Sequence, residues 1–301
     1  MKLFFKYINV IVLIVFALIF GFELLLRQIP NDYSVKANYL KKHGNEIETL
    51  ILGSSHTFYG INPNLIPNSY NLAHSSKSYD LDWKILEKNE KYLTQLKTII
   101  LSSSYFSFVH IVENSTQKDL LKYYAIYYKI NTNSINLKTN TEIFNLPLSE
   151  NINRLKDYNT KSKDYITIDN KGYILKRRKQ DLDKYYSTET VKKHTLPFDS
   201  FVVNKNINGL KHILKFAKER KINVIFVTTP VSPNYFKNVN RQQFLHWTKT
   251  TNNFIKASPS FIWINYFNQP EKFEKADFID ADHLSLKGAN KITQEVLKYI
   301  K

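Results

Sequence analysis

Two short segments near opposite ends of the 301-residue chain carry the residue types of serine nucleophile chemistry. In the first segment, Ser55 follows a compact apolar run, residues 48–52, through the pair Gly53 and Ser54. This pattern predicts a buried strand that ends in a tight turn, from which a serine hydroxyl can project. Many strand-to-helix turns carry serine only as a helix cap, so Ser55 needs partners before it indicates catalysis.

The second segment supplies a histidine with a nearby carboxylate. Asp280 lies three residues before His283, and in a loop such a carboxylate can curl back to accept from the imidazole Nδ1–H. Of the eight histidines, His283 alone combines this partner with a position between a predicted strand and a predicted helix. We therefore predict that Ser55 is a nucleophile, His283 its base and Asp280 the residue that orients the base. Without Ser55, the same segment would be interpreted as an acidic loop with a solvated histidine.

A metal site is the alternative chemistry for these segments. Asp280, Asp282, His283, His56 and His74 are all of ligand type, because imidazole and carboxylate groups both bind metals. None of them forms the helical pair of histidines four residues apart that makes a metal motif specific. We therefore expect neither a metal nor another cofactor, and we expect His56 to shape the pocket beside Ser55.

The elements that would position these residues alternate between strand and helix. Apolar runs predict strands at residues 48–52, 70–73, 97–101, 222–228 and 261–266. Helical spacing of apolar residues marks 81–93, 116–128, 210–217 and 289–300, the last with Ser285 as its N-cap. Parallel strands need such crossover connections, so the rhythm predicts an α/β fold with a parallel, doubly wound sheet. Ligands of such sheets bind at the carboxyl ends of the strands, where both chemical segments fall.

One long stretch, at about residues 130–195, interrupts this rhythm. It is rich in Asn, Lys and Tyr and shows no clear period, so we interpret it as an irregular insertion. Within it, residues 165–175 resemble a hairpin with an Asn-Lys-Gly turn. We expect the insertion to cover or flank the site.

The N-terminus predicts a membrane anchor. Lys2 and Lys6 precede an apolar run over residues 7–22 that resumes at 24–26 after Glu23. About 20 residues span a bilayer as a helix, and no small-residue cleavage site follows the run. Leading positive charges favour a cytoplasmic N-terminus and a body on the exported side. A buried helix of a soluble protein is the alternative.

The predicted organisation follows from this anchor. Residues 1–30 form a transmembrane signal anchor, 31–45 a polar stalk, and 46–301 the chemical domain with its insertion. Glu23 and Arg27 lie one helical turn apart and are predicted to pair at the membrane boundary, which reduces the cost of a carboxylate there.

Charge and cysteine content exclude several functions. The net charge of +17 would suit a polyanionic partner, but the lysines are spread along the chain and no nucleic-acid-binding motif accompanies them. We therefore expect no nucleic acid as a partner. The chain has no cysteine, which excludes disulfides, thiolate catalysis and cysteine-based zinc sites.

The two chemical segments together resemble the SGNH/GDSL hydrolase superfamily. Residues 52–56, Leu-Gly-Ser-Ser-His, are similar to its first block, normally Gly-Asp-Ser, and Asp280-x-x-His283 is similar to its last block, Asp-x-x-His. The order and separation of the blocks agree. The resemblance runs from about residue 48 to the C-terminus and implies a three-layer α/β/α, flavodoxin-like fold with Ser-His-Asp chemistry on esters.

The two middle blocks depart from the family pattern. The second block, which supplies a Gly N–H to the oxyanion hole, corresponds to residues 71–78, where Ser76 is the best match. The third, Gly-x-Asn-Asp, is replaced by residues 102–105, where Ser104 could place a hydroxyl. Ser54 replaces the usual Asp of the first block, as in anchored relatives such as teichoic-acid D-alanyl transfer and alginate-acetylation proteins. Loss of one oxyanion donor typically costs about a hundredfold or more in rate.

The resemblance implies an exported, membrane-anchored acyl esterase or O-acyltransferase that acts on a cell-envelope glycan. Its substrates would be an acylated glycan or an acyl donor, and relatives of this type often work beside a membrane-bound O-acyltransferase. The missing Asn of the third block favours a second hypothesis, a glycan-binding or scaffold protein of such a complex without turnover.

Overall fold

The computed structural model describes residues 1–134, 136–161, 164–177, 179–269 and 271–300. Contacts between residues divide the chain into two compact units. One comprises residues 1–37 and 118–167, and the other comprises residues 38–117 and 168–301. The predicted anchor, stalk and chemical domain describe membrane topology rather than packing, and they stay predictions.

The second unit contains all five strands and most of the helices. The strands are β1 (Thr49–Leu52), β2 (Ser69–Asn71), β3 (Thr98–Ser102), β4 (Asn223–Thr228) and β5 (Phe261–Asn265). The helices are α3 (Ser55–Gly60), α4 (Tyr79–Asn89), α8 (Leu182–Tyr186), α9 (Glu189–His194), α10 (Ser200–Glu219), α11 (Pro233–Lys237), α12 (Arg241–Ile255) and α13 (Leu286–Leu297). The other unit contains α1 (Lys2–Gln28), α5 (Leu121–Ile126), α6 (Leu137–Asn140) and α7 (Leu148–Lys161), and α2 (Asp32–His43) spans the point where the chain passes between units.

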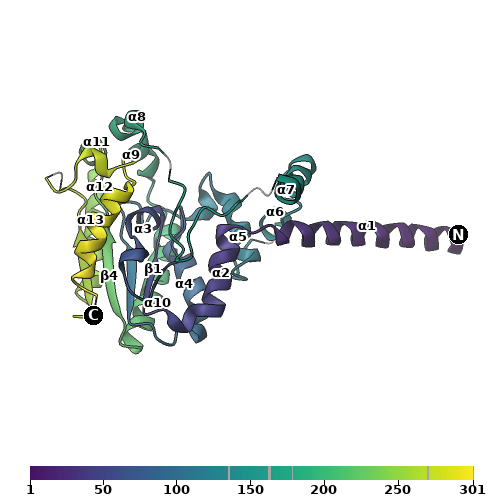
Figure 1. The fold of residues 1–301 in the computed structure, drawn as a ribbon, viewed down its shortest axis with the longest axis horizontal. Coiled ribbons are helices and arrows are strands. Elements are labelled where there is room, and N and C mark those ends of the chain that lie inside the picture. The colour runs from purple at the N-terminus through teal and green to yellow at the C-terminus, as the bar shows by residue number, and fades with distance from the viewer. Residues whose placement is uncertain (135, 162–163, 178, 270, 301) are drawn as a thin grey trace. The chain divides into compact units, whose positions relative to one another are not determined.

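The strands form one parallel sheet in the order β2-β1-β3-β4-β5, of which β1 and β4 are labelled in Figure 1. In the register, Leu50 of β1 pairs with Tyr70 of β2 and with Ile99 of β3. Every residue of β1, β2 and β3 is buried, as expected for a parallel sheet covered on both faces. This strand order is the flavodoxin-like one, so the predicted fold class is confirmed.

Right-handed crossovers place the helices in two layers. The chain steps from β1 to β2 through α3, then returns past β1 to β3 through α4, and continues in that direction through α10 and α12. The reversal puts α4, α10 and α12 on one face of the sheet and α3 on the other. Consistent with this, α4 packs against α10 and α13 packs against α3. The direction changes between β1 and β3, so a crevice opens beyond the carboxyl ends of these two strands.

Several local predictions differ from the structure. The predicted stalk contains the helix α2, and the stretch predicted to be irregular contains α6, α7, α8 and α9. The predicted hairpin is reduced to a single antiparallel bridge between Ile168 and Ile174, beside Gly172 with a φ of 75°. The helix expected at 116–128 is a short 3-10 turn, Lys118–Leu120, followed by α5. Apart from α7, these helices have four to six residues, which is too few to produce a readable period, and α7 buries Asn151 alone.

The helix α1 has the length that the apolar run predicts. Among the described residues it is the one helix long and apolar enough to cross a membrane. Near its end, the Nε–H of Arg27 donates to Glu23 at 2.6 Å, so the predicted pairing is confirmed.

A buried ion pair supports the turn after β1. The Lys77 Nζ lies 2.7 Å from an Asp82 carboxylate oxygen, and neither side chain is exposed. The same Asp82 oxygen accepts from the Gly53 N–H at 3.1 Å, and Lys77 also donates to the Leu72 carbonyl at 2.8 Å. The pair therefore connects the β1 turn, the segment after β2 and α4.

We predict that Lys77→Met lowers the free energy of unfolding of the full chain by about 3–5 kcal/mol, because the Asp82 carboxylate is left buried without its partner. Chemical denaturation of the detergent-solubilised protein measures this loss. Lys97→Met is the matched control, because the pair between Lys97 and Glu48 is exposed and should contribute about 0–1 kcal/mol. Equal losses in the two variants would contradict a special role for the buried pair.

Candidate active site

The turn that carries Ser55 is fixed by close contact with β3. Gly53 has a φ of 110°, and a Cβ added there would lie 2.1 Å from the Ser102 Oγ, so no other residue fits. The Ser54 N–H donates to the same Ser102 hydroxyl at 3.0 Å. Ser55 is the first residue of α3, and within the described residues no hydrogen bond uses its backbone N–H.

The loop that carries His283 is held by its own backbone. Phe278 and Leu284 form an antiparallel bridge, and the Ile279 N–H donates to the His283 carbonyl at 2.8 Å. One oxygen of Asp280 accepts from the backbone N–H groups of Asp282, at 3.2 Å, and His283, at 2.9 Å. These bonds orient the Asp280 carboxylate before any side-chain contact is made.

The predicted N-cap of α13 is confirmed, and it holds the end of the loop that carries His283. The Ser285 hydroxyl accepts from the Gly288 N–H at 3.3 Å and begins α13, as the sequence predicts.

A continuous hydrogen-bond chain joins the three predicted catalytic residues. Both carboxylate oxygens of Asp280 lie 3.0 Å from His283 Nδ1, and His283 Nε2 lies 2.9 Å from the Ser55 Oγ. An ionised carboxylate only accepts, so the Nδ1 nitrogen carries the proton and Nε2 accepts from the Ser55 hydroxyl. This is the geometry of a nucleophile, its base and the carboxylate that orients the base.

A second serine, histidine and aspartate lie directly beside this chain. The Asp282 carboxylate is 3.0 Å from His56 Nε2, and His56 Nδ1 is 2.7 Å from the Ser104 Oγ. Asp282 is buried, which alone would raise the pKa of its carboxyl, but His283, His56 and His194 together hold that pKa well below its usual range. Asp282 therefore accepts from the His56 Nε2–H, and His56 Nδ1 accepts from the Ser104 hydroxyl.

The second hydrogen-bond chain contains two of the three predicted pocket residues, His56 and Ser104. His56 is buried beside Ser55, where the sequence places it. Ser104 is in the pocket, but its only proton is directed at His56 rather than at a substrate oxygen. The Ser76 hydroxyl donates to the Gln117 side chain at 2.6 Å, and its backbone has a φ of 59°.

His194, at the end of the predicted insertion, is a further member of the site. Its Nδ1 lies 2.9 Å from the Tyr235 hydroxyl and 3.7 Å from Asp282 Oδ2. The Phe106 ring packs against both imidazoles, with centroid distances of 5.3 Å to His56 and 4.3 Å to His194. Burial, together with the neighbouring histidines, lowers the pKa of His194 to about 4 although Asp282 opposes the shift. No local pattern in the sequence indicates this residue.

Arg177 joins the two segments that are predicted to be catalytic. Its guanidinium donates to the carbonyl of Leu284, next to His283, at 2.7 Å, and to the carbonyl of Tyr59, in α3, at 2.8 Å. It also donates to the Tyr173 hydroxyl. Sequence reasoning missed this arginine because its main partners are backbone carbonyls, which carry no signal in the residue types.

Three of the five residues weighed as metal ligands come together. The ligand atoms of His56, Asp282 and His283 all lie within 4.8 Å of one another. His74 is also buried, and its ring is tilted against Phe58 at a centroid distance of 6.5 Å. Three such groups could supply the protein ligands of a zinc site. The metal alternative therefore predicts that Asp282 is a metal ligand and that its loss abolishes activity.

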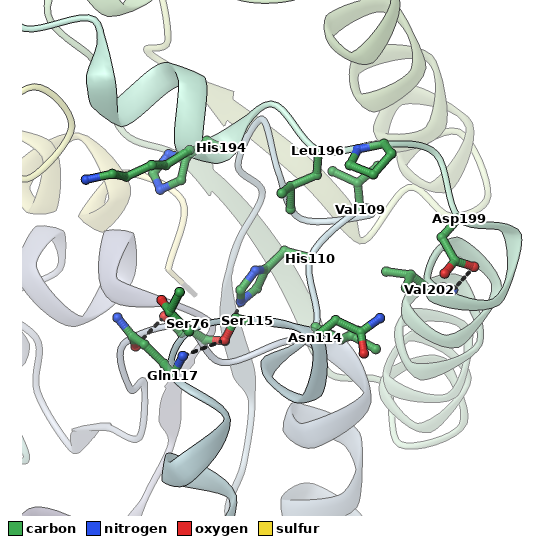
Figure 2. A pocket seen from close by; sticks show the side chains of 14 residues that line it. Ser76, Val109, His110, Asn114, Ser115, Gln117, His194, Leu196, Asp199 and Val202 are labelled. Carbon is green, nitrogen blue, oxygen red and sulfur yellow. Dashed lines mark hydrogen bonds between the residues drawn. The ribbon is translucent and has the colours of Figure 1, made fainter.

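A cavity of about 720 Å³ is lined by His194, whose Nδ1 lies 3.7 Å from Asp282. It is bounded by His194 and His110, which come from different segments and are both labelled in Figure 2. Burial lowers the pKa of His110, as it lowers that of His194, so both imidazoles are neutral near pH 7. The remaining wall combines hydroxyl and amide side chains with apolar ones and two charged residues: Ser76, Val109, Ile111, Asn114, Ser115, Thr116, Gln117, Lys193, Leu196, Pro197, Asp199 and Val202.

Comparison with known proteins gives only distant likenesses. No protein-family model matches the sequence, and no curated protein gives a significant match. A proposed platelet activating factor from Streptococcus pneumoniae is 13% identical with a TM-score of 0.44, over 95% of this chain and 99% of that one. A GDSL-like lipase from Bacteroides thetaiotaomicron is 9% identical with a TM-score of 0.44, over 89% and 98%. A proposed acylhydrolase from Bacteroides fragilis is 10% identical with a TM-score of 0.39, over 93% and 96%. These values are too low to assign any of these activities to this chain.

We predict that His194 makes the folded protein less stable in mild acid. The folded pKa of about 4 lies below the unfolded value near 6.5, so between these pH values the unfolded chain binds a proton that the folded chain does not. Stability should therefore fall as the pH falls from about 6.5 towards 4, and His194→Gln should lose less stability than the wild type over that range.

Thermal unfolding at about pH 7.5 and about pH 5 measures the difference. His43→Gln, which removes an exposed histidine, is the control and should keep the wild-type dependence on pH. A His194→Gln protein with the same pH dependence as the wild type would contradict the assignment.

Proposed function

We propose that this protein is a membrane-anchored serine acyl esterase or O-acyltransferase that acts on a cell-envelope glycan from the exported side of the membrane. The observation that carries the proposal is the unbroken hydrogen-bond chain from Asp280 through His283 to Ser55. The similarity of the two chain segments to the first and last blocks of the SGNH/GDSL superfamily supports the same chemistry.

In the proposed first step, the Ser55 Oγ attacks the carbonyl carbon of an ester while His283 Nε2 accepts the hydroxyl proton. The bond from the carbonyl carbon to the alcohol oxygen then breaks, and His283 returns the proton to the departing alcohol. An acyl-Ser55 ester remains. In the second step, His283 deprotonates water or a glycan hydroxyl, which attacks the acyl carbon, and Ser55 regains its proton. Asp280 holds the imidazole tautomer and stabilises the imidazolium throughout.

Stabilisation of the oxyanion would depend on the Ser55 backbone N–H. This N–H lies at the N-terminal end of α3, and it donates to no acceptor among the described residues. Ser104, the expected replacement for the family's Asn, donates its hydroxyl proton to His56. Because each missing donor typically costs about 10²–10³ in rate, we expect turnover to be slow unless substrate binding adds a donor.

The cavity beside His194 is the proposed position for the sugar part of the substrate. Its volume falls within the range of ligand pockets, roughly 300–1,000 Å³. Asn114, Ser115, Thr116 and Gln117 contribute hydroxyl and amide groups that can bond sugar hydroxyls, and the neutral histidines add no net charge. Lys193 and Asp199 in the same wall are of opposite sign, so the wall suits a polyhydroxylated group without net charge.

The position at the membrane is proposed from α1 and the positive charges that precede its apolar run. This arrangement suits a partner that delivers acyl groups within the membrane, such as a membrane-bound O-acyltransferase.

The second candidate function is a glycan-binding scaffold without turnover, which the engagement of Ser104 by His56 favours. The same cavity would then bind a glycan while Ser55 stays unacylated. The two functions differ in one measurable property, the nucleophilicity of Ser55.

We predict that a fluorophosphonate probe labels the wild-type chain covalently and that Ser55→Ala abolishes labelling. Loss of a triad serine lowers turnover by about 10⁶-fold in a well-studied serine hydrolase, whereas the loss of one turn hydroxyl should alter stability little. Gel fluorescence of detergent-solubilised protein and hydrolysis of a model acetyl ester provide the measurements.

Ser54→Ala is the matched control on the same turn, because no hydrogen bond within the described part of the chain uses the Ser54 hydroxyl. This variant should be labelled like the wild type. A folded wild-type chain that remains unlabelled would favour the scaffold, and labelling of Ser55→Ala would refute the assigned nucleophile.

We predict that Asp280→Asn and Asp282→Asn differ strongly if the serine mechanism holds. Asp280→Asn should lower hydrolysis of the acetyl ester by several orders of magnitude, with about 10⁴-fold as the precedent, because the imidazole tautomer is lost. Asp282→Asn should cost less, since the His283 Nδ1–H is hydrogen-bonded to Asp280 at 3.0 Å, whereas Asp282 lies 3.3 Å from that nitrogen and accepts from His56. Assays with and without chelator complete the comparison. A loss at Asp282→Asn at least as large as that at Asp280→Asn, with full sensitivity to chelator, would establish a metal site instead, because Asp282 is the carboxylate in the cluster with His56 and His283.

A further inference from the structure

The unit that contains α1 ties a distant part of the chain to the end of that helix. The Glu23 carboxylate accepts from the backbone N–H groups of Glu142, at 3.0 Å, and Ile143, at 2.8 Å. The Arg27 guanidinium donates to the Asn140 carbonyl at 3.3 Å. Residues 140–143 are therefore held beside the last turns of α1.

The position of Glu23 along α1 sets the level of this contact. The apolar run over residues 7–26 of this helix spans roughly 30 Å at 1.5 Å per residue, and Glu23 lies within one turn of its end. The hydrocarbon layer of a bilayer is about 30 Å thick. If α1 crosses the membrane, Glu23 and the segment bonded to it lie at the boundary between acyl chains and headgroups.

Four large apolar side chains are exposed in this same segment, and we call them the apolar patch. They are Leu137 in α6, Phe144, and Leu148 and Ile152 in α7, with exposed fractions of 61%, 43%, 60% and 50%. Leu148 and Ile152 are four residues apart and thus share one face of α7. Exposed apolar groups that gather in this way usually mark an interaction surface.

The segment is built rigidly enough to present the patch. Buried Glu142 is 2.9 Å from the Lys122 ammonium and 3.1 Å from the Arg154 guanidinium, which comes from α7. Burial would raise the pKa of Glu142, but these two cations hold it below its usual value, so the cluster stays charged. Asn151 of α7 adds bonds to the carbonyls of Ile143, at 3.0 Å, and Leu146, at 3.2 Å.

We propose that the apolar patch is a second membrane contact, in which α6 and α7 lie in the headgroup layer beside α1 and insert Leu137, Phe144, Leu148 and Ile152 among the acyl chains. The proposal rests on the membrane anchoring proposed above. Lipid is the occupant because the patch adjoins the helix whose own apolar surface, including Leu24 and Leu25, is exposed to the same layer.

The flanking charges agree with this occupant. Lys138 and Lys156 are exposed beside the patch, and lysines so placed can extend to phosphate headgroups. The contact would fix α1 at its exit from the bilayer and prevent it from acting as a free tether.

Depth-dependent fluorescence quenching in membranes tests the proposal on the full chain. The chain contains no cysteine, so single variants Leu148→Cys and Ile152→Cys can each carry an environment-sensitive dye. Asn153→Cys is the matched control, because Asn153 is exposed on another face of α7. Val12→Cys, in the middle of α1, reports whether that helix crosses the bilayer. The vesicles contain phosphatidylethanolamine and phosphatidylglycerol with a quencher at a shallow or a deep acyl position.

We expect the dyes at 148 and 152 to shift to the blue and to lie about 5–10 Å below the headgroup boundary, while the dye at 153 stays in water. The dye at 12 should be reached by the deep quencher.

If the dyes at 148 and 152 are quenched by aqueous iodide as strongly as the dye at 153, the patch faces water and the proposal is wrong. It is also wrong if they shift to the blue but ignore the lipid quenchers, because a second protein copy would then cover the patch. If the dye at 12 also escapes the deep quencher, the anchor and the patch both fail, while labelling of Ser55 still decides the chemistry separately.

Discussion

The hydrogen bonds at Gly53 and Ser54 are the constraint on which the site depends. The Gly53 N–H is bound by Asp82 and the Ser54 N–H by Ser102, so the turn after β1 is fixed to α4 and to β3 at once. Ser55 follows this turn directly, and its distance to His283 is set by where the turn is held. The chain reverses its direction between β1 and β3, and ligands of such sheets generally bind beyond the carboxyl ends of the strands at this point.

Around Ser55, the structure provides more groups that support the base His283 than hydrogen-bond donors for an oxyanion. His283 has two carboxylates near its Nδ1, Asp280 at 3.0 Å and Asp282 at 3.3 Å, and Asp282 also accepts from the His56 Nε2–H at 3.0 Å. An imidazolium formed at His283 is therefore well stabilised. The same network uses the Ser104 proton, so the stabilisation of the base and the loss of an oxyanion donor have one structural cause.

The sequence predicts the strands, the fold class and the meeting of Ser55, His283 and Asp280, because each depends on apolar runs and on local spacing. It does not reveal the pair of Lys77 and Asp82, whose partners are brought together only by the folded turn. It also misses His194 and Arg177, which reach the site from the stretch without a readable period. The 14-residue helix α7 also remains hidden, since Asn151 is its one buried residue and no apolar face marks it in the sequence.

The proposed anchor and the weak oxyanion site are consistent with each other in physical terms. An enzyme with few oxyanion donors forms and breaks its acyl intermediate slowly, so its flux depends on how often substrate occupies the site. Tethering a site to the surface that carries its substrate replaces a bimolecular encounter by an effective concentration, which reaches about millimolar for short tethers. A second contact at α6 and α7 would shorten the effective tether further. Selection for a strong oxyanion hole is then weaker than it would be for an enzyme that must find its substrate in solution.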